Sequence, residues 1–386
     1  MRHRSLSILS KSGSDGSPLF SFAARRVQSP RSRIWLTRPS DMSVQLKLSP
    51  EPSADVILLD TNVPEPIIWP VAGGEGGTGK STLTANIGVG LALLGYKVVL
   101  VDCDLGGSDL HLFFDQISPE RSLSNFLTKE VRSLEEVLLP TPNANLHLVC
   151  GGNDLVGMAN LSFMAKAKLL RHIRSLDADY ILIDLGAGSA YNTIDFFTLS
   201  NSGIIVCTPE PHARVDAYGF IKNTVYRMLR RHFKKASQVS DTIADFSRQA
   251  GRKSGKVEHL LDSIADLDPG LAQEGRELLR EFRPKLLLNR VRNKRHIAEA
   301  RRFLALVEEY LSIRLDYVGY VRNDDKIMDA CDRRRPMLLH APKSSASMDV
   351  FSVLMGGLQV PDRLHRFSAQ QHRKLAQVAK SEAKFW

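Results

Sequence analysis

The stretch GGEGGTGKST, residues 73–82, decides what this chain folds into. It fits the pattern G-x-x-x-x-G-K-[ST] through Gly74, Gly79, Lys80 and Ser81. An apolar, β-rich run at residues 67–71 comes before it, and a helical pattern at residues 82–94 follows it. A strand, a glycine-rich loop and a helix in this order predict a loop that wraps a phosphate chain.

The residue types in this loop suit a nucleoside triphosphate. Glycines leave room for backbone N–H groups to point at a phosphate, and the helix that follows adds the positive end of its dipole. Lys80 is expected to neutralise the β- and γ-phosphates, and the Ser81 hydroxyl is expected to bind Mg²⁺. The loop residues expected to contact the nucleotide are Gly74, Glu75, Gly76, Gly77, Thr78, Gly79, Lys80, Ser81 and Thr82.

Two further segments place carboxylates directly after apolar strands. Asp102 and Asp104 follow the run at residues 98–101, and Asp184 follows the run at residues 180–183. A carboxylate at the end of a buried strand is costly unless it serves a cation or a strong set of donors. Each aspartate taken alone would also suit the N-cap of a helix.

The spacing of these groups assigns a role to each. Asp184 is expected to hold Mg²⁺ through water, Asp104 to orient or activate the attacking water, and Asp102 to support the structure. The backbone N–H of Gly186 is expected to reach the γ-phosphate. The predicted catalytic residues are Lys80, Asp104 and Asp184, and the predicted Mg²⁺ ligands are Ser81, Asp104 and Asp184.

Apolar runs alternate with helical patterns along most of the chain, which predicts an α/β fold. Candidate strands cover residues 67–71, 98–102, 146–150, 180–184, 203–208, 285–289 and 316–320. Their continuous apolar character is typical of strands buried on both faces, so we expect a doubly wound, mainly parallel sheet with helices on both faces. Pro70 fits its strand poorly because it lacks a backbone donor. Three of the four cysteines lie in these runs or directly after one, which favours buried thiols over disulfides or a metal cluster.

Composition divides the chain into three parts. With 43% hydrophobic and 24% charged residues it is globular, so fully disordered and fibrous classes are excluded. We expect a disordered basic extension at residues 1–50, a P-loop domain at 51–360 and a basic amphipathic tail at 361–386. Helical patterns at residues 226–236, 241–250 and 273–282 predict a helical insertion at about 222–284.

The formal charge of +10 belongs to the two ends. Residues 1–50 hold nine Lys and Arg against two acids, and residues 361–386 hold six against two, which leaves 37 basic and 38 acidic residues between them. The Arg- and Ser-rich start imitates an organelle transit peptide. Alternatively Met42 is the initiator and residues 1–41 are not translated, and both interpretations stay open.

These motifs resemble the MinD/ParA group of deviant Walker A ATPases over residues 67–351. The resemblance covers the loop, D-x-D at 102–104, DLGAG at 184–188, TPEP at 208–211 and the late stretch GYVRNDDKIMDACDRRRPMLL at 319–339. In detail the chain looks most like the FlhG/FleN-like branch. The resemblance implies an ATP- and Mg²⁺-dependent switch that forms a homodimer on ATP, with a protein partner that stimulates hydrolysis, and that positions a flagellum or a division site. It also implies that Asn289 binds the adenine edge, that residues 321–324 flank the base and that Arg333, Arg334 and Arg335 lie near the nucleotide.

One residue departs from the family pattern. The family carries a lysine two residues after the position of Gly73, which reaches the phosphates of the partner protomer, and this chain has Glu75 there. A carboxylate beside a triphosphate replaces attraction by repulsion. We therefore expect ATP binding through Lys80 but weakened dimerisation and hydrolysis, and a hydrolysis-impaired nucleotide-binding regulator is the alternative function.

Surface charge leaves two docking partners to consider. The basic helix predicted at 226–236 suits DNA phosphates or an acidic partner, but it also suits a solvated face, and the near-neutral core makes a ParA-like DNA partition ATPase the weaker alternative. The tail places Leu364, Phe367 and Leu375 among basic residues at helical spacing, which suits an anionic membrane surface as well as a docked terminal helix. The expected location is cytoplasmic, peripheral at the inner face of the plasma membrane.

Overall fold

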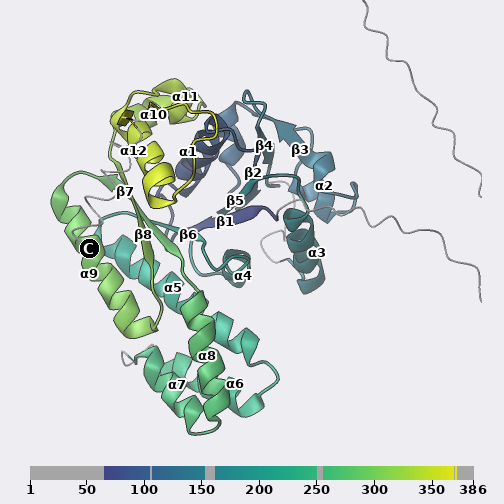
Figure 1. Cartoon of the computed structure of the whole chain (residues 1–386). Coiled ribbons are helices and arrows are strands. Elements are labelled where there is room, and N and C mark those ends of the chain that lie inside the picture. Colours follow the sequence, from purple (N-terminus) through teal and green to yellow (C-terminus); the bar gives the residue numbers. More distant parts are fainter. Residues whose placement is uncertain (1–64, 105–106, 153–160, 250–254, 369, 372–386) are drawn as a thin grey trace, which may run out of the picture. The chain divides into compact units, whose positions relative to one another are not determined.

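The computed structural model describes residues 65–371, except 105–106, 153–160, 250–254 and 369 (Figure 1). The predicted N-terminal extension and residues 372–386 of the predicted tail lie outside these residues. No helix in the described part is both long and apolar enough to span a bilayer. The first residues of the tail are not helical as predicted, because Leu364 and Phe367 lie in a turn segment that packs on the body, with the Phe367 ring 4.8 Å from that of Phe351.

The sheet has eight strands in the order β3-β4-β2-β5-β1-β6-β7-β8. Every neighbouring pair is parallel except β3 and β4 at one edge. The strands are β1 (Ile67–Ala72), β2 (Val98–Cys103), β3 (Leu138–Pro140), β4 (Leu146–Val149), β5 (Tyr180–Leu185), β6 (Ile204–Cys207), β7 (Lys285–Val291) and β8 (Asp316–Arg322). The predicted α/β, mainly parallel sheet is confirmed, and pairing of β1 with β6 begins at Val71, one residue after Pro70.

Helices cover both faces of the sheet (Figure 1). They are α1 (Lys80–Leu93), α2 (Leu123–Leu127), α3 (Phe163–Arg174), α4 (Tyr191–Phe197), α5 (Pro211–His232), α6 (Ser237–Gln249), α7 (Val257–Ala265), α8 (Pro269–Glu281), α9 (Lys294–Leu311), α10 (Asp325–Asp332), α11 (Met337–His340) and α12 (Ser345–Ser352). One hydrophobic cluster joins the sheet to α3, α4, α5 and α9, and the other joins it to α1, α10, α11 and α12. This is the doubly wound arrangement that the strand pattern predicts.

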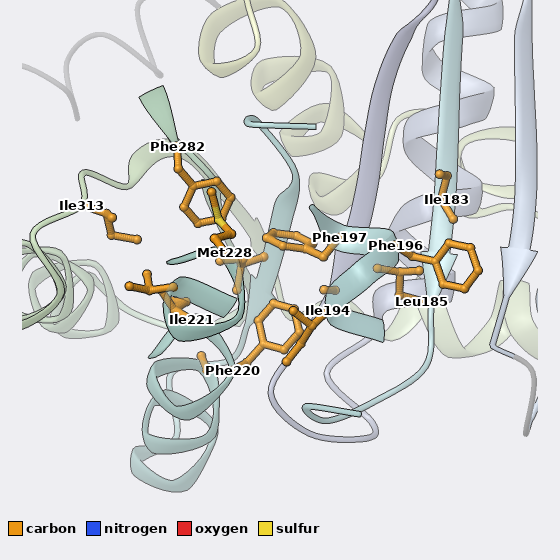
Figure 2. Packing of buried hydrophobic residues seen from close by; sticks show 14 of the residues in the cluster. Ile183, Leu185, Ile194, Phe196, Phe197, Phe220, Ile221, Met228, Phe282 and Ile313 are labelled. Atoms are coloured by element: carbon orange, nitrogen blue, oxygen red, sulfur yellow. The ribbon is translucent and has the colours of Figure 1, made fainter. Parts of the chain in front are cut away.

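The first cluster is rich in aromatic side chains from α4 and α5. Phe196 of α4 lies beside Leu185 of β5, and Phe220 of α5 lies on the other side of α4 beside Ile194 (Figure 2). The Phe197 ring lies 5.0 Å from that of Phe220 in an edge-on contact. Such contacts fix α4 and α5 against the sheet, and so fix the loops at their amino ends.

The helix predicted at residues 226–236 is wrong in its bounds. Helix α5 begins at Pro211, where the proline occupies the first turn, and continues unbroken to His232. It therefore passes through residue 222, where the predicted insertion was expected to begin. Helices α6, α7 and α8 follow it, and the buried apolar residues of α6 and α7, among them Ile243 and Leu260, belong to the same cluster as the sheet.

Lys285 offers a test of the packing at the amino end of β7. Burial lowers the pKa of its ammonium group, Asp316 opposes that shift, and Arg283 adds to it. A charged lysine held in this environment destabilises the folded chain. We expect Lys285→Met to raise the free energy of unfolding at pH 7 by on the order of 1 kcal/mol, or a few degrees in Tm.

The pH dependence of the same variant separates charge from packing. Because the pKa of Lys285 is lower in the folded chain, the unfolded chain binds more protons between that pKa and 10.5, and stability rises with pH in that window. Chemical denaturation from pH 7 to pH 10.5 is expected to show this rise in the natural chain and a smaller one in Lys285→Met. Parallel curves for the two chains would contradict the assignment.

Candidate nucleotide-binding site

The predicted site residues meet at the carboxyl edge of the central strands. In the sheet Asp184 lies opposite Val71 of β1 on one side and Asp102 of β2 on the other. The phosphate-binding loop, residues 73–79, follows β1 directly and leads into α1. Parallel strands bring the loop and both carboxylates to one edge of the sheet, which is where α/β folds bind ligands.

Glycine is required at several loop positions. Gly77 and Gly79 have φ values of 75° and 87°, a left-handed conformation that other residues adopt at a cost, and Gly79 is the N-cap of α1. A side chain on Gly74 would lie 2.1 Å from the backbone of Asp216 in α5. The loop is therefore fixed by its own conformation and by its close packing against α5.

Lys80 is buried at the start of α1, and its ammonium group turns back over the loop. It is 8% exposed, and Nζ donates a hydrogen bond of 3.2 Å to the carbonyl of Glu75. A buried ammonium group that crosses a glycine-rich loop is placed to meet the phosphates the loop would wrap. Its role as a catalytic residue remains a prediction.

Asp184 is buried beside the first turn of α1. It is 1% exposed, and Oδ1 accepts a hydrogen bond of 3.2 Å from the Thr84 hydroxyl. Burial raises the pKa of its carboxyl group well above the usual value, and Asp102 adds to the rise, while a hydrogen bond from Ser81 and the charge of Lys80 oppose it. Asp184, Ser81 and Lys80 therefore form one electrostatic group.

The neighbouring aspartates have different surroundings. Asp102 is fully buried, and its carboxylate accepts hydrogen bonds from the Ser108 hydroxyl at 2.6 Å and from the backbone N–H groups of Asp104 and Leu110. Burial raises its pKa to about 7 against the effect of these donors. Asp102 thus fastens the segment after β2, which agrees with the supporting role expected of it.

The Asp104 carboxylate lies against Gly186. A side chain on Gly186 would place its first carbon 2.9 Å from Asp104 Oδ1, so it would require the carboxylate to shift. The backbone N–H of Gly188 in the same segment donates to the Gly73 carbonyl at 3.3 Å. These contacts bring the segments after β1, β2 and β5 together, and the part played by Asp104 in catalysis or metal binding stays a prediction.

Asn289 contacts the phosphate-binding loop itself. Its Nδ2 donates to the Thr78 carbonyl at 2.8 Å, and its Oδ1 accepts from the backbone N–H of Arg290 at 2.9 Å. A side chain on Gly79 would lie 2.3 Å from Asn289 Nδ2. This buried amide therefore supports the loop, and the expected contact with adenine, which would use its second N–H, remains a prediction.

We expect Asn289→Asp to weaken nucleotide binding by about tenfold or more, because a carboxylate would face the Thr78 carbonyl that the amide now hydrogen-bonds. The matched control is Asn293→Asp. Asn293 caps α9 with its side-chain oxygen, a role that aspartate fills equally well. Titration of both variants with ADP checks this, and equal losses in the two would show that Asn289 has no special role.

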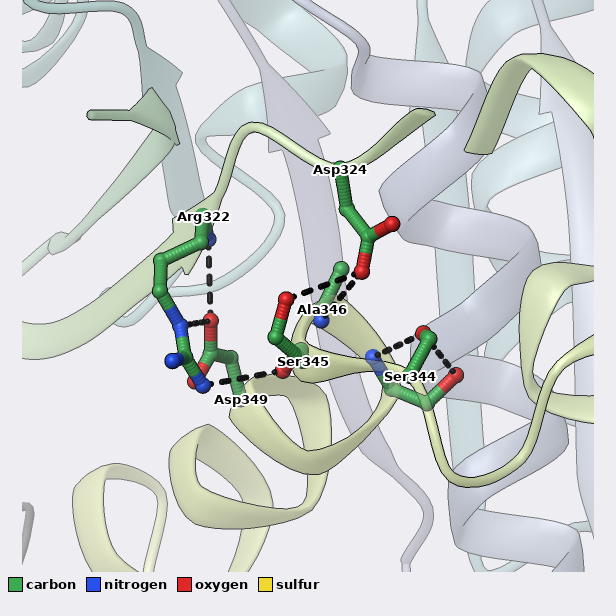
Figure 3. A network of polar contacts seen from close by, with 7 residues as sticks. Arg322, Asp324, Ser344, Ser345, Ala346 and Asp349 are labelled. Atoms are coloured by element: carbon green, nitrogen blue, oxygen red, sulfur yellow. Dashed lines mark hydrogen bonds and ion pairs between the residues drawn. The ribbon is translucent and has the colours of Figure 1, made fainter. Parts of the chain in front are cut away.

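Residues 321–324 are tied to the start of α12 (Figure 3). Arg322 forms a two-pronged ion pair with Asp349, with Nε and Nη2 each 2.7 Å from a carboxylate oxygen. Asp324 Oδ2 accepts from the Ser345 hydroxyl and from the backbone N–H of Ala346. The segment expected to flank the base is thus held in place, while its contact with a base stays a prediction.

The arginines 333–335 lie between α10 and α11, and their nearness to a nucleotide stays a prediction. The Cys331 thiol in α10 shares a hydrogen bond with the Thr82 side chain, and Asn86 Oδ1 in α1 accepts from the backbone N–H of Leu338. Arg334 lies 3.5 Å from Asp115. The contacts of Cys331 and Leu338 join α10 and α11 to the helix of the loop, so the segment that carries the arginines is held beside α1.

Comparison with known proteins places this geometry in a family. The sequence profile of the CobQ/CobB/MinD/ParA nucleotide-binding domain matches residues 69–337. The chain belongs to this family. The match includes the phosphate-binding loop, both aspartate segments and Asn289, so the predicted resemblance to MinD/ParA ATPases is confirmed.

Curated relatives in the family carry different roles. FleN of Pseudomonas aeruginosa, an antiactivator, is 24% identical over 280 residues, which is 72% of this chain and 81% of FleN. The flagellum site-determining protein YlxH of Helicobacter pylori is 32% identical over 157 residues, 39% of this chain and 51% of YlxH. The septum site-determining protein MinD of Bacillus subtilis is 23% identical, with 72% and 84% covered.

Solved structures agree on the fold. MinD in the MinC:MinD cell division complex of Aquifex aeolicus matches with a TM-score of 0.52 and 20% identity, and covers 78% of this chain and 100% of that one. The cell division ATPase MinD of Pyrococcus furiosus has a TM-score of 0.51 at 20% identity, with 74% and 96% covered. At these identities the likeness shows the P-loop fold of the MinD/ParA family.

His212 is a neighbour of the site that the sequence did not indicate. Its Nε2 lies 3.5 Å from Glu75 Oε1, and it stands in the first turn of α5. The Glu75 side chain is 26% exposed and that of His212 is 68% exposed. Glu75, the residue that departs from the MinD/ParA pattern, therefore has His212 as a neighbour in space. No motif could reveal this contact, because 137 positions separate the two residues in the sequence.

The residues fit magnesium bound together with a nucleotide. Among the described residues no group of three or more His, Cys, Asp or Glu side chains is placed to hold a metal alone. A single buried carboxylate, Asp184, and the hydroxyl of Ser81 are oxygen donors of the kind Mg²⁺ prefers, and Mg²⁺ in such sites takes its other ligands from phosphates and water. Ser81 and Asp184 would hold the ion, which would neutralise phosphate charge.

Proposed function

We propose that this MinD/ParA-family protein is a Mg²⁺-dependent ATP-binding switch that hydrolyses ATP slowly. The observation that carries the proposal is the meeting of Lys80, Ser81 and Asp184 around one glycine-rich loop. Such a site catalyses by positioning the phosphates and stabilising charge, so no covalent intermediate is needed. In this proposal ATP lies between two protomers, and hydrolysis releases the dimer.

The proposed role is to position or regulate a large assembly, a flagellum or a division site. Relatives of both kinds support it, since YlxH is named for flagellum sites and MinD for septum sites. The proposed partners are a second copy of the chain and a protein that stimulates hydrolysis. We further propose that residues 361–386 contact an anionic membrane surface, the cytoplasmic face of the plasma membrane. Pelleting with anionic liposomes that is unchanged after removal of residues 364–386 would eliminate the membrane contact.

Calorimetric titration of the full chain with Mg·ATP tests the nucleotide site directly. We expect saturable binding of one ATP per chain, lost when Mg²⁺ is chelated, together with an increase in molar mass by light scattering. Absence of any binding would overturn the proposal as a whole. Binding without dimerisation or turnover would instead favour the second candidate, a hydrolysis-impaired regulator, for which Glu75 is the specific observation.

A further inference from the structure

A positively charged pocket lies away from the nucleotide site. It has a volume of about 610 Å³ and is formed by α3, α4, the carboxyl-terminal part of α5 and the start of α6. Its charged lining residues are Lys166, Asp195, Arg227, Arg230, Arg231 and Lys234. Five cations face one acid, which gives the pocket a net charge of +4 in a chain whose middle part is close to neutral.

Asp195 organises the inner cations. Its carboxylate is 2.6 Å from Lys166 Nζ and accepts two hydrogen bonds from Arg227, at 2.9 and 3.0 Å. Burial opposes its ionisation, but the hydrogen bonds from Arg227 and Lys166 hold the pKa of Asp195 below its usual value. Arg231 also approaches it at 3.6 Å. One carboxylate thus fixes three cations whose combined charge it cannot neutralise.

The outer cations have no such partner. Arg230 and Lys234 are exposed, and within the part of the chain that the structure covers neither forms an ion pair or a hydrogen bond. Arg227, Arg230 and Arg231 share one face of α5, and Lys234 follows two residues after the helix ends. Like charges this close repel one another, so the fold gains nothing from gathering them.

The pocket is separate from the phosphate-binding loop. Helix α5 meets the loop near its amino end, where His212 lies by Glu75 and Asp216 by Gly74, whereas Arg227 lies eleven residues beyond Asp216, about 16 Å at the usual rise of a helix. The pocket and the nucleotide site share no residue. An inference about one therefore stands independently of the other.

We propose that this pocket binds a compact polyphosphate, a small molecule that carries several phosphate groups. Arginine presents a planar fork of donors that matches phosphate oxygens, and Arg230, Arg231 and Lys234 stand at the rim with donors to spare. A net charge of +4 within one small pocket requires several negative charges in a small volume. Peptide carboxylates and the phosphates of a nucleic acid are spread over a length that such a pocket does not hold.

The apolar part of the lining agrees with a small molecule. Ala167 and Leu170 of α3 contribute to the pocket beside the cations. They offer a surface for a ring or carbon skeleton while the phosphates face the rim. Arg227 is further held by the ring of Tyr191, 4.9 Å from its guanidinium carbon, so the inner wall is preorganised.

Calorimetry with myo-inositol hexakisphosphate in magnesium-free buffer tests the pocket in the full chain. This branched probe is too bulky for a loop that wraps a linear phosphate chain. We expect binding of one molecule per chain. The variant Arg230→Gln/Lys234→Gln should bind it at least about tenfold more weakly, because two charge-assisted contacts are lost.

The matched control, Arg314→Gln/Lys343→Gln, removes the same charge from exposed positions outside the pocket and is expected to bind the probe within about twofold of the natural chain. Thermal unfolding should be equal for both variants, since all four residues are exposed. Undiminished binding by the pocket variant would overturn the proposal. So would tighter binding of hexaglutamate or of duplex DNA than of the probe, because each would assign the cations to a peptide or a nucleic acid.

Discussion

Replacing Lys80 with methionine is expected to lower the affinity for Mg·ATP at least a hundredfold and to abolish turnover. The ammonium group of Lys80 is buried and crosses the phosphate-binding loop, where Nζ donates to the Glu75 carbonyl at 3.2 Å. Two unit charges about 4 Å apart at an effective dielectric of about 20 interact by about 4 kcal/mol. Losing even half of that energy would weaken ATP binding by more than about tenfold. The expected loss is larger because Lys80 is expected to contact two phosphates, the β- and the γ-phosphate.

Methionine is the chosen replacement because it keeps the stem of the lysine. The Lys80 stem packs close to Gly73, and a shorter side chain would leave a gap beside the loop. The control is Lys97→Met, which removes an exposed lysine that precedes β2, at the opposite edge of the sheet. Calorimetry should show normal ATP binding by the control, and retention of ATP affinity in Lys80→Met would mean that the loop does not hold the phosphates.

Much of this site followed from the order of residue types along the chain. The strands, the loop and the first helix were predicted within one or two residues, because buried parallel strands leave long apolar runs and a phosphate-binding loop has a fixed spacing. Strand β3 was missed because it is a three-residue antiparallel edge with no such run. Helix α7, at residues 257–265, was missed as well, although helical patterns were recognised on either side of it at residues 241–250 and 273–282.

Contacts between distant segments could not be predicted in the same way. A motif placed Asn289 at the end of a strand, but only the fold shows its amide hydrogen-bonded to Thr78. The basic run after residue 226 fitted a solvated face equally well until α3 and α4 supplied Lys166 and Asp195. Pairings of this kind depend on how helices and strands pack against one another. The periodicity of one element carries no information about that packing.

Replacing Glu75 with lysine is expected to raise ATP-driven dimerisation and turnover by roughly tenfold or more. Glu75 belongs to the loop that would wrap the phosphates, and its side chain is three-quarters buried beside His212. A carboxylate there repels a triphosphate, and several kcal/mol separate repulsion from attraction at an effective dielectric near 20. Partial exposure of the Glu75 side chain reduces this difference, so we expect a smaller change than for Lys80.

A series of three variants divides the effect into two parts. Glu75→Gln removes the repulsion within one protomer, so it should improve ATP affinity while dimerisation changes little. Glu75→Lys adds the cation that family members use across the dimer, so it should also increase the molar mass measured with ATP. Glu120→Lys makes the same change at an exposed position outside the site and should match the natural chain.

The comparison of Glu75→Gln with Glu75→Lys separates the two effects. Both variants lose the carboxylate, and Glu75→Lys alone gains a positive charge. A gain confined to Glu75→Lys would locate the deficit in the contact between protomers. A gain of equal size in both would locate it in the phosphate-binding loop of a single protomer. Turnover and ATP-dependent mass equal to those of the natural chain in all three variants would mean that Glu75 does not restrain this protein.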